Sequence, residues 1–433
     1  MKIHSIDAWQ IFDSRGNPTV EAEVLLEGGA TGCGMVPSGA STGQFEALEL
    51  RDSDPRKFRG RSVFRAIENI RSEIAPRLVG MDAGDQRAVD DALIALDGTP
   101  DKSRLGANAL LAVSMAVASA SAVAQGVPLF RSLGGGTLLP LPEIQIFGGG
   151  AHADWRTDIQ DFLVIATGAG TYEETLEMTF HVFHAAGDLM KERGHRFGVA
   201  DEGGYWPEFR SNEEAIETLL RAIERAGYTP GQEVAISLDI AASDLLDPKT
   251  GLYHFRIEDR VFDSDAFAEL ITEWRHKYPI VSIEDPLADT DTEGWKKLTA
   301  ALGTKTQLVG DDLFTTNPAR IQRGIGERLA NAALIKLNQI GTVSETLEAI
   351  RLTQSAGWAP IISARSGETE DAFIAHLAVA TNAGQLKVGS FSRSERMAKW
   401  NEVLRIQRAL GQDARFDGSR ASLPPATRFP KSH

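Results

Sequence analysis

Cysteine is almost absent from this chain, since Cys33 is the single one among 433 residues. One thiol cannot form an intramolecular disulfide, and disulfide-free proteins are typical of a reducing compartment. The N-terminal residues 1–5 begin a strand-like pattern and lack the long apolar region of a secretory signal. We therefore expect a cytoplasmic protein.

Long uninterrupted apolar runs are also missing. The longest apolar stretch, residues 107–124, is interrupted by Asn108 and by several serines. Such a stretch favours a helix buried in a protein core over a membrane span. We expect no membrane-spanning segment.

Net positive charge is lacking as well. Lys and Arg number 45 and Asp and Glu number 60, which gives a formal charge of −15. A surface of this sign repels nucleic acid and anionic membranes, so we expect neither as a partner. A small anionic substrate stays possible, because a local cluster of cations or a metal ion can reverse the field inside one cleft.

The chain is too long for one ordinary core and predicts two domains. Strand and helix patterns mix in the first third. Strands are expected over residues 3–12 and 18–27, and helices over 62–78, 85–95 and 105–125. Gly134, Gly135 and Gly136 then interrupt the chain, and we place a domain boundary near residue 137. The expected divisions are residues 1–137, residues 138–425 and a loose tail over 426–433.

The sequence pattern changes after this boundary. Short apolar runs each end at an ionisable residue and are followed by a helical stretch. The six residues that end these runs are Asp239, Glu284, Asp311, Lys336, Arg365 and Lys387. Alternating strands and helices predict a parallel sheet, and ionisable residues at successive strand ends predict a closed (β/α)₈ barrel with its site at that rim.

Three carboxylates at that rim predict a metal site. Asp239, Glu284 and Asp311 would repel one another unless a cation lay between them, and oxygen-only ligands suit Mg²⁺. The alternative is that each acid only caps the helix that follows it.

Basic residues share the same rim. Lys336 lies between Ile335 and Leu337, and partial burial beside other cations would favour its neutral form, as a general base requires. The alternative is a surface lysine with an ion-pair partner. Arg365 and Ser366 form an anion-binding corner. Glu202 precedes two glycines and His152 follows three, both in expected loops. Each of these patterns alone is a weak indication of a site residue.

Taken together, these segments resemble the enolase (phosphopyruvate hydratase) family over nearly the whole chain. The matching segments are residues 13–20, 37–43, 105–109, 201–204, 282–286, 310–313, 336–342, 365–371 and 393–396. The resemblance implies an N-terminal α+β capping domain, a modified (β/α)₈ barrel, two Mg²⁺ ions and a homodimer or higher oligomer. It also implies a small phosphorylated hydroxy-acid substrate and a place in glycolysis.

The resemblance assigns roles residue by residue. For the metals it implies Asp239, Glu284 and Asp311 on the tightly held ion and Ser41 on the ion that arrives with substrate. For the chemistry it implies Lys336 as the base, Glu202 as the acid that assists loss of the β-hydroxyl, and Asp161 as the second acid. For the substrate it implies His152, Gln160, Arg365, Ser366 and Lys387.

Three departures from the family pattern concern the hydroxyl-leaving side. Ala364 stands where the family has His, which removes a polar partner and leaves space. Asp161 stands where the family has Glu, so that acid is one methylene shorter. The covering loop, residues 148–159, carries Trp155 and Arg156, which we expect to change the volume and charge above the substrate.

Three functions fit this pattern. The first is dehydration of 2-phosphoglycerate to phosphoenolpyruvate, slowed by the altered residues. The second is the same chemistry on a related phosphorylated or phosphonate-bearing hydroxy acid, as in enolase-like enzymes that form carboxyphosphonoenolpyruvate. The third is a binding or scaffold protein with little catalysis. Losing one acid–base partner typically lowers a rate by roughly 10²–10⁴.

Overall fold

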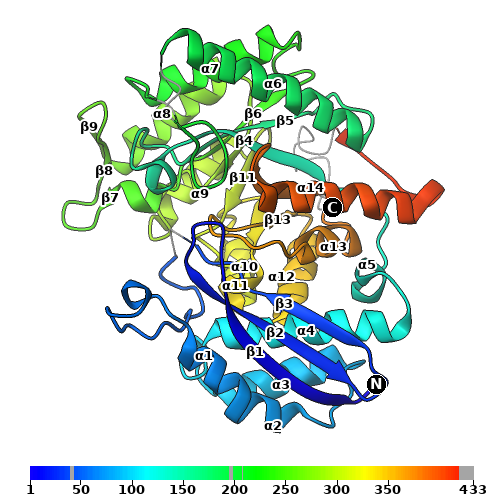
Figure 1. Cartoon of the computed structure of the whole chain (residues 1–433). Helices are drawn as coiled ribbons and strands as arrows, with labels where there is room; N and C mark the ends of the chain where they lie inside the picture. Colours follow the sequence, from blue (N-terminus) through cyan, green and yellow to red (C-terminus); the bar gives the residue numbers. More distant parts are fainter. Residues whose placement is uncertain (40–42, 195–197, 207, 419–433) are drawn as a thin grey trace, which may run out of the picture.

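The computed structural model describes residues 1–39, 43–194, 198–206 and 208–418 (Figure 1). The chain begins with an antiparallel sheet in the order β1-β2-β3. Its strands are β1 (Ile3–Phe12), β2 (Pro18–Leu26) and β3 (Thr31–Met35). The first two match the expected strands closely. The third was not foreseen, because Thr31–Met35 has no alternating apolar pattern.

Helical segments follow this sheet, and those over residues 64–78 and 107–125 pack on it. They are α1 (Phe64–Asn69), a π-helical turn (Ile70–Ile74), α2 (Ala75–Leu78), α3 (Gln86–Asp97), α4 (Ala107–Gln125) and α5 (Leu129–Leu133). Two glycines of β3 let α4 lie directly on the sheet. A Cβ atom at Gly32 would lie 2.1 Å from the Ala120 nitrogen, and one at Gly34 would lie 2.4 Å from the Ala112 oxygen.

The apolar helix α4 belongs to the protein core. By length and composition it could cross a membrane, but 83% of its apolar window is buried inside the protein. It packs against β2 and β3, and its side chains from Ala107 to Ala118 are buried on all sides. A helix that is apolar all round is expected in such a setting.

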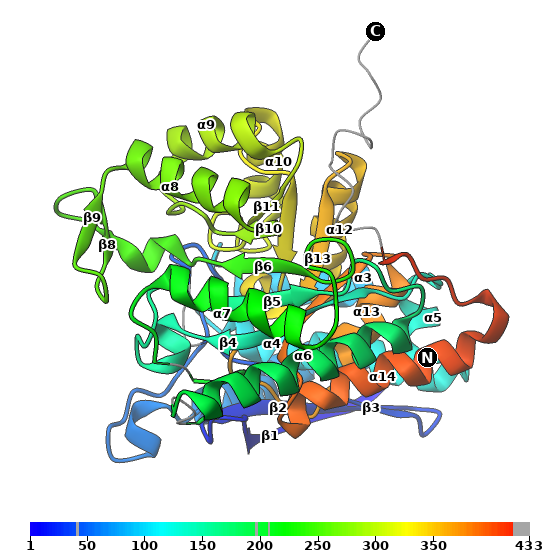
Figure 2. The ribbon, with the colours of Figure 1, turned by 90° about the horizontal axis from the view of Figure 1, so that it is seen from above.

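The second part of the chain forms a closed eight-stranded barrel in the order β10-β11-β12-β13-β14-β4-β5-β6 (Figure 2). Its strands are β4 (Leu141–Gly148), β5 (Asp161–Ile165), β6 (Ala235–Asp239), β10 (Ile280–Glu284), β11 (Gln307–Gly310), β12 (Ala332–Ile335), β13 (Ala359–Ser363) and β14 (Gln385–Ser390). The fold class expected from sequence is confirmed. The expectation of an all-parallel sheet is wrong at one strand, because β5 runs antiparallel to both β4 and β6.

Helices surround the barrel, and a small hairpin sheet extends from it. The helices are α6 (Tyr172–Glu192), α7 (Asn212–Arg225), α8 (Ser264–Lys277), α9 (Thr292–Leu302), α10 (Pro318–Glu327), α11 (Leu337–Ile340), α12 (Val343–Ser355), α13 (Phe373–Ala380) and α14 (Ser394–Leu410), and the hairpin sheet holds β7 (Leu246–Asp247), β8 (Leu252–Phe255) and β9 (Arg260–Phe262). Several helices begin at capping side chains. The Thr171 hydroxyl accepts from the Glu174 N–H, and the Ser211 hydroxyl accepts from the Glu214 N–H.

The N-terminal part packs against the barrel beside the rim where strands end. The Lys102 ammonium lies 3.0 Å from the Glu345 carboxylate. Ser38 and Gly367 exchange backbone hydrogen bonds of 2.9 Å in each direction. These contacts bring the loop that begins at Ser38 next to the loop after β13. We propose residues 1–137 and 138–425 as the two domains; the predicted tail lies outside the described residues.

Candidate active site

Acidic and basic side chains gather at the rim of the barrel where the parallel strands end. Asp239 is the last residue of β6 and Glu284 the last of β10, while Asp311 directly follows β11. Lys336 directly follows β12. The carboxyl ends of parallel barrel strands share one rim, which explains why residues far apart in sequence meet there.

The antiparallel strand β5 brings its first residue to this same rim. Asp161 opens β5 and pairs in register with Asp239 on one side and with Gly148 on the other. Had β5 been parallel to its neighbours, Asp161 would lie at the opposite end of the barrel. The direction of β5 therefore decides that Asp161 belongs to the site.

Two lysines neutralise the acids. The Lys387 ammonium lies 2.8 Å from Asp239 Oδ2 and 2.7 Å from Glu284 Oε2, and the Lys336 ammonium lies 2.5 Å from Asp311 Oδ2. Burial, and then the charge of Asp239, raises the pKa of Glu284 well above its usual range. Burial acts to lower the pKa of Lys387, but Asp239 and Glu284 outweigh it and the pKa is raised well above the usual range.

Two sequence expectations about these lysines are wrong. Lys387 does not end its strand; it is the third residue of β14, and its side chain points into the barrel. The net pKa shift of Lys336 also differs from the expectation. Burial acts to lower its pKa as expected, but the Asp311 carboxylate outweighs burial and the pKa is raised.

The predicted metal ligands fit Mg²⁺ by the chemistry of their donors. Asp239 and Glu284 offer buried carboxylate oxygens to one cation, the Lys387 ammonium, and Glu284 Oε1 has no hydrogen-bond partner within the described part of the chain. Asp311 is held beside them by Asp285, whose oxygens accept the N–H groups of Asp311 and Asp312 at 2.9 and 2.8 Å. Hard, buried oxygen donors around a cation are what Mg²⁺ requires.

The carboxylates of the three predicted ligands do not form one compact group among the described residues. Among the described residues, the acidic groups whose ligand atoms all lie within 4.8 Å of one another are Asp285 with Asp311 and Asp312, and His152 with Asp161 and Glu202. The two lysines contact these carboxylates, Lys387 those of Asp239 and Glu284 and Lys336 that of Asp311. Ser41, predicted for the second ion, lies outside the described residues.

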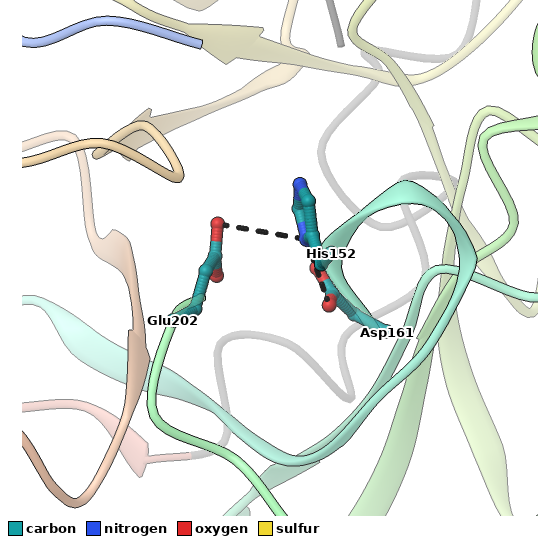
Figure 3. A group of neighbouring side chains, drawn as sticks. All are labelled: His152, Asp161 and Glu202. Atoms are coloured by element: carbon teal, nitrogen blue, oxygen red, sulfur yellow. Dashed lines mark ion pairs between the residues drawn. The ribbon is translucent and has the colours of Figure 1, made fainter. Parts of the chain in front are cut away.

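The second of these groups lies at the same site, and Figure 3 shows Glu202 and Asp161 beside the His152 ring. His152 Nδ1 lies 3.5 Å from Asp161 Oδ1 and 3.9 Å from Glu202 Oε1. Burial acts to lower the pKa of His152, but the Asp161 carboxylate outweighs it and the pKa is raised. Burial, and then Asp161, raises the pKa of Glu202. A carboxyl with a raised pKa is suited to donate a proton.

Backbone geometry holds these loops in place. Gly150 has φ +48° and opens the short 3₁₀ turn (Gly150–Ala153) that carries His152. Gly203 has φ +96°, directly after Glu202. The Glu202 carbonyl accepts the Ser390 N–H at 2.9 Å, which fixes the loop against β14. The glycines noted in the sequence thus serve turns that aim both side chains inward.

The anion-binding corner follows β13. Arg365 is 3% exposed, and its guanidinium donates to both oxygens of Glu46 at 2.9 and 3.1 Å and to Asn338 Oδ1 at 3.0 Å. Arg15 Nη1 donates to the Ser366 hydroxyl at 3.3 Å. Burial acts to lower the pKa of Arg365, but Glu46 outweighs it and the pKa is raised. An incoming anion must compete with Glu46 for this guanidinium.

Residues of both groups line one cavity. Its lining is almost entirely polar and charged and draws on both sequence-predicted groups. The lining residues are Gly39, His152, Gln160, Asp161, Glu202, Asp239, Lys336, Ser363, Ala364, Arg365, Ser366, Lys387, Val388 and Gly389. Glu284 and Asp311 lie just behind this surface, bound to the two lysines.

The altered positions behave differently from one another. Ala364 lines the cavity, as expected for a residue that leaves space. Trp155 and Arg156 are not among the residues that line it. The Arg256 guanidinium stacks 3.9 Å from the Trp155 ring, and Arg156 lies over the Trp206 ring at 5.5 Å. These cation–π contacts hold both side chains away from the cavity.

Sequence reasoning missed several polar residues around the site. Glu143 is 2% exposed, faces the barrel interior and pairs in register with Lys387. Gln145, two residues on, bonds to Asp161 and is fully buried. Both lie in Leu141–Gly148, which carries no motif. Asp285 and Glu46 could have been found from the sequence, since Asp285 lies in a matched segment and Glu46 lies close to one.

Models of known protein families match both parts of the chain. The family model described as "Enolase, N-terminal domain" matches residues 3–133. The family model described as "Enolase, C-terminal TIM barrel domain" matches residues 136–424. Among similar proteins is Enolase 1 of Desulfitobacterium hafniense (strain Y51). It is 54% identical over 418 residues, which covers 96% of this chain and 95% of that protein.

Proposed function

The chain belongs to the enolase family, and from that premise we propose that it removes the proton alpha to the carboxylate of 2-phosphoglycerate or a close analogue and expels the β-hydroxyl. The product is an enol phosphate. The chain is thus a carbon–oxygen lyase of the phosphopyruvate hydratase type, and Mg²⁺ is its proposed cofactor.

One observation carries this proposal. A base candidate and an acid candidate line a single cavity: Lys336 from the strand end of β12, and Glu202 from the loop between α6 and α7. Elimination across a carbon–carbon bond needs both a proton acceptor at one carbon and a proton donor at the leaving oxygen. A binding protein has no need of this arrangement, which disfavours the scaffold alternative.

The substrate contacts follow from the charges. Arg365 and Ser366 would hold the phosphate, and Lys387 would contact the carboxylate. Lys336 would accept the α-proton at its Nζ atom, and Glu202 would protonate the departing hydroxyl. His152, Asp161 and Gln160 would exclude water and orient the hydroxyl.

Asp239, Glu284 and Asp311 would hold the tightly bound Mg²⁺, and Ser41 would contribute to a second ion that arrives with substrate. When bound, the metal supplies positive charge beside the substrate carboxylate, where negative charge develops. Asp285 would orient Asp311, because it accepts both adjoining N–H groups.

The altered residues favour a second candidate of the same chemistry. Ala364 and the short Asp161 both face the cavity on the hydroxyl side, which leaves room for a larger or different substituent there. A phosphonate-bearing hydroxy acid of the type used to form carboxyphosphonoenolpyruvate fits that description.

The experiment that separates these candidates uses ultraviolet absorbance of the enol product, with Mg²⁺ and 2-phosphoglycerate. Product formation by the wild-type protein supports the first candidate. No product from the wild type, with product formed by the Ala364→His and Asp161→Glu double variant, supports the second. No α-proton exchange on any phosphorylated hydroxy acid in D₂O would overturn both.

We also propose a cytoplasmic location and a homodimer or higher oligomer. A single cysteine, Cys33, and an acidic net charge of −15 agree with a reducing compartment and with a small-molecule substrate. Sedimentation of the purified full chain measures its oligomeric state directly.

A further inference from the structure

The side chain of Gln145 lies between the two acid-bearing elements of the site. Gln145 belongs to β4 and is fully buried. Its Nε2 atom donates to Asp161 Oδ1, and its Oε1 atom accepts the Gly204 N–H at 2.8 Å. A backbone N–H can only donate, so the amide oxygen must face Gly204 and the amide nitrogen must face the Asp161 carboxylate.

Two glycines, Gly148 and Gly204, leave room for this long side chain. A Cβ atom at Gly204 would lie 2.4 Å from Gln145 Oε1. A Cβ atom at Gly148 would lie 3.2 Å from Gln145 Nε2 and 2.4 Å from the Ala200 side chain. Side chains at either position would push the amide away from Asp161.

Gln145 also engages only one of the two carboxylate oxygens of Asp161. Asp161 Oδ1 is taken by the amide and lies 3.5 Å from His152 Nδ1. Asp161 Oδ2 has no hydrogen-bond partner in the part of the chain that the structure describes, and it lies 3.7 Å from the Lys387 ammonium. One oxygen is therefore anchored, and the other is left for substrate.

We propose that Gln145 is a positioning residue whose length is matched to that of Asp161. Gln has one methylene more than Asn, and this methylene makes up for the one that Asp161 lacks relative to Glu. The same amide holds the loop that carries Glu202, so it sets the spacing of the two acids. This inference rests on the proposed function, because it concerns the step in which the β-hydroxyl leaves. It predicts that Asn at 145 with Glu at 161 spans the same distance.

The test is a double-mutant cycle of Gln145→Asn, Asp161→Glu and both together, assayed for elimination and for α-proton exchange. Each single variant should lower the elimination rate by roughly 10-fold to 10²-fold, since small displacements of a reacting group have effects of this size. The double variant should return to within about threefold of wild type. In each single variant exchange by Lys336 should fall less than elimination does, whereas a general loss of folding lowers both equally.

A matched control is Gln385→Asn. Gln385 is a buried amide of β14 that bonds to Gln307 rather than to an acid of the site, at 2.6 Å. This variant should leave the ratio of elimination to exchange unchanged, so a shift in that ratio at Gln145 reports on the acids and not on core packing.

A second readout needs no activity. The imidazole titration of His152, followed by nitrogen NMR, should shift in each single variant and return in the double variant, because the Asp161 carboxylate moves relative to His152 and then returns. Losses in the double variant that multiply those of the singles, or a Gln145→Asn variant with unchanged elimination and titration, would overturn the inference. A wild type without exchange would instead count against the proposed function.

Discussion

Replacing Lys387 with Met should show how strongly the stability of the protein depends on this ammonium between buried acids. In the wild type, the Lys387 ammonium contacts Asp239 and Glu284 at 2.8 and 2.7 Å, and the two carboxylates are 3% and 2% exposed. Met keeps much of the apolar length but removes the charge. Two buried acids then face each other and Asp161 with no cation between them.

The size of the effect follows from burial. Removing one partner of a buried ion pair typically destabilises a protein by about 3–5 kcal/mol. Unfolding entropies near 2.1 cal/mol/K per residue give about 0.9 kcal/mol/K for 433 residues, so Tm should fall by about 3–6 °C in EDTA. The matched control is Lys277→Met, whose partner Glu213 is at the surface and whose own side chain is 58% exposed. That pair should contribute at most about 1 kcal/mol.

Magnesium supplies the decisive comparison. Mg²⁺ binds the same carboxylates without a competing ammonium in the variant, so it should raise the Tm of Lys387→Met by more than it raises that of the wild type. Thermal unfolding with EDTA and with Mg²⁺ measures both effects. A Lys387→Met protein as stable as Lys277→Met in EDTA, or one that Mg²⁺ stabilises no more than the wild type, would refute the reasoning.

Three further outcomes are expected. Glu46→Gln should lower KM for a phosphorylated substrate about fivefold, because a neutral amide competes less well than a carboxylate for Arg365; an equal or higher KM in steady-state kinetics would contradict this. Asp285→Asn should weaken Mg²⁺ binding roughly 10- to 100-fold in calorimetric titration, since it loses one acceptor for the N–H groups that orient Asp311; unchanged affinity would count against it. Burial raises the pKa of Glu143 above 4.5, so the folded chain keeps a proton that the unfolded chain loses, and the contribution of Glu143 to wild-type stability falls as pH rises above about 4.5. Glu143→Gln removes that loss, and its Tm relative to wild type should climb with pH; a difference constant with pH would exclude this explanation.

The barrel and its rim could be predicted from sequence because one signal repeats. Each apolar run ends at an ionisable residue, and parallel strands place such ends together, which located Asp239, Glu284 and Asp311. The motifs then supplied roles that spacing alone could not. Lys387 was placed at a strand end because the apolar run before it is short, whereas β14 continues beyond it.

Strand direction and side-chain partners could not be predicted in the same way. Nothing in Asp161–Ile165 indicates that β5 runs opposite to its neighbours, yet that direction brings Asp161 to the rim. The raised pKa of Lys336 depends on the through-space contact with Asp311, which outweighs the burial that was foreseen. Gln145 acts through an amide in a strand without a motif. Such features depend on tertiary contacts that local sequence does not encode.

Deuterium exchange at the α-carbon of 2-phosphoglycerate or its phosphonate analogues, followed by NMR in D₂O, tests most directly whether Lys336 removes that proton beside a bound magnesium ion. We expect the wild type with Mg²⁺ to exchange the α-proton. Lys336→Met, or wild type in EDTA, should exchange it at least roughly 10²-fold more slowly. Exchange at the wild-type rate in the Lys336→Met variant, or undiminished exchange in EDTA, would contradict the account.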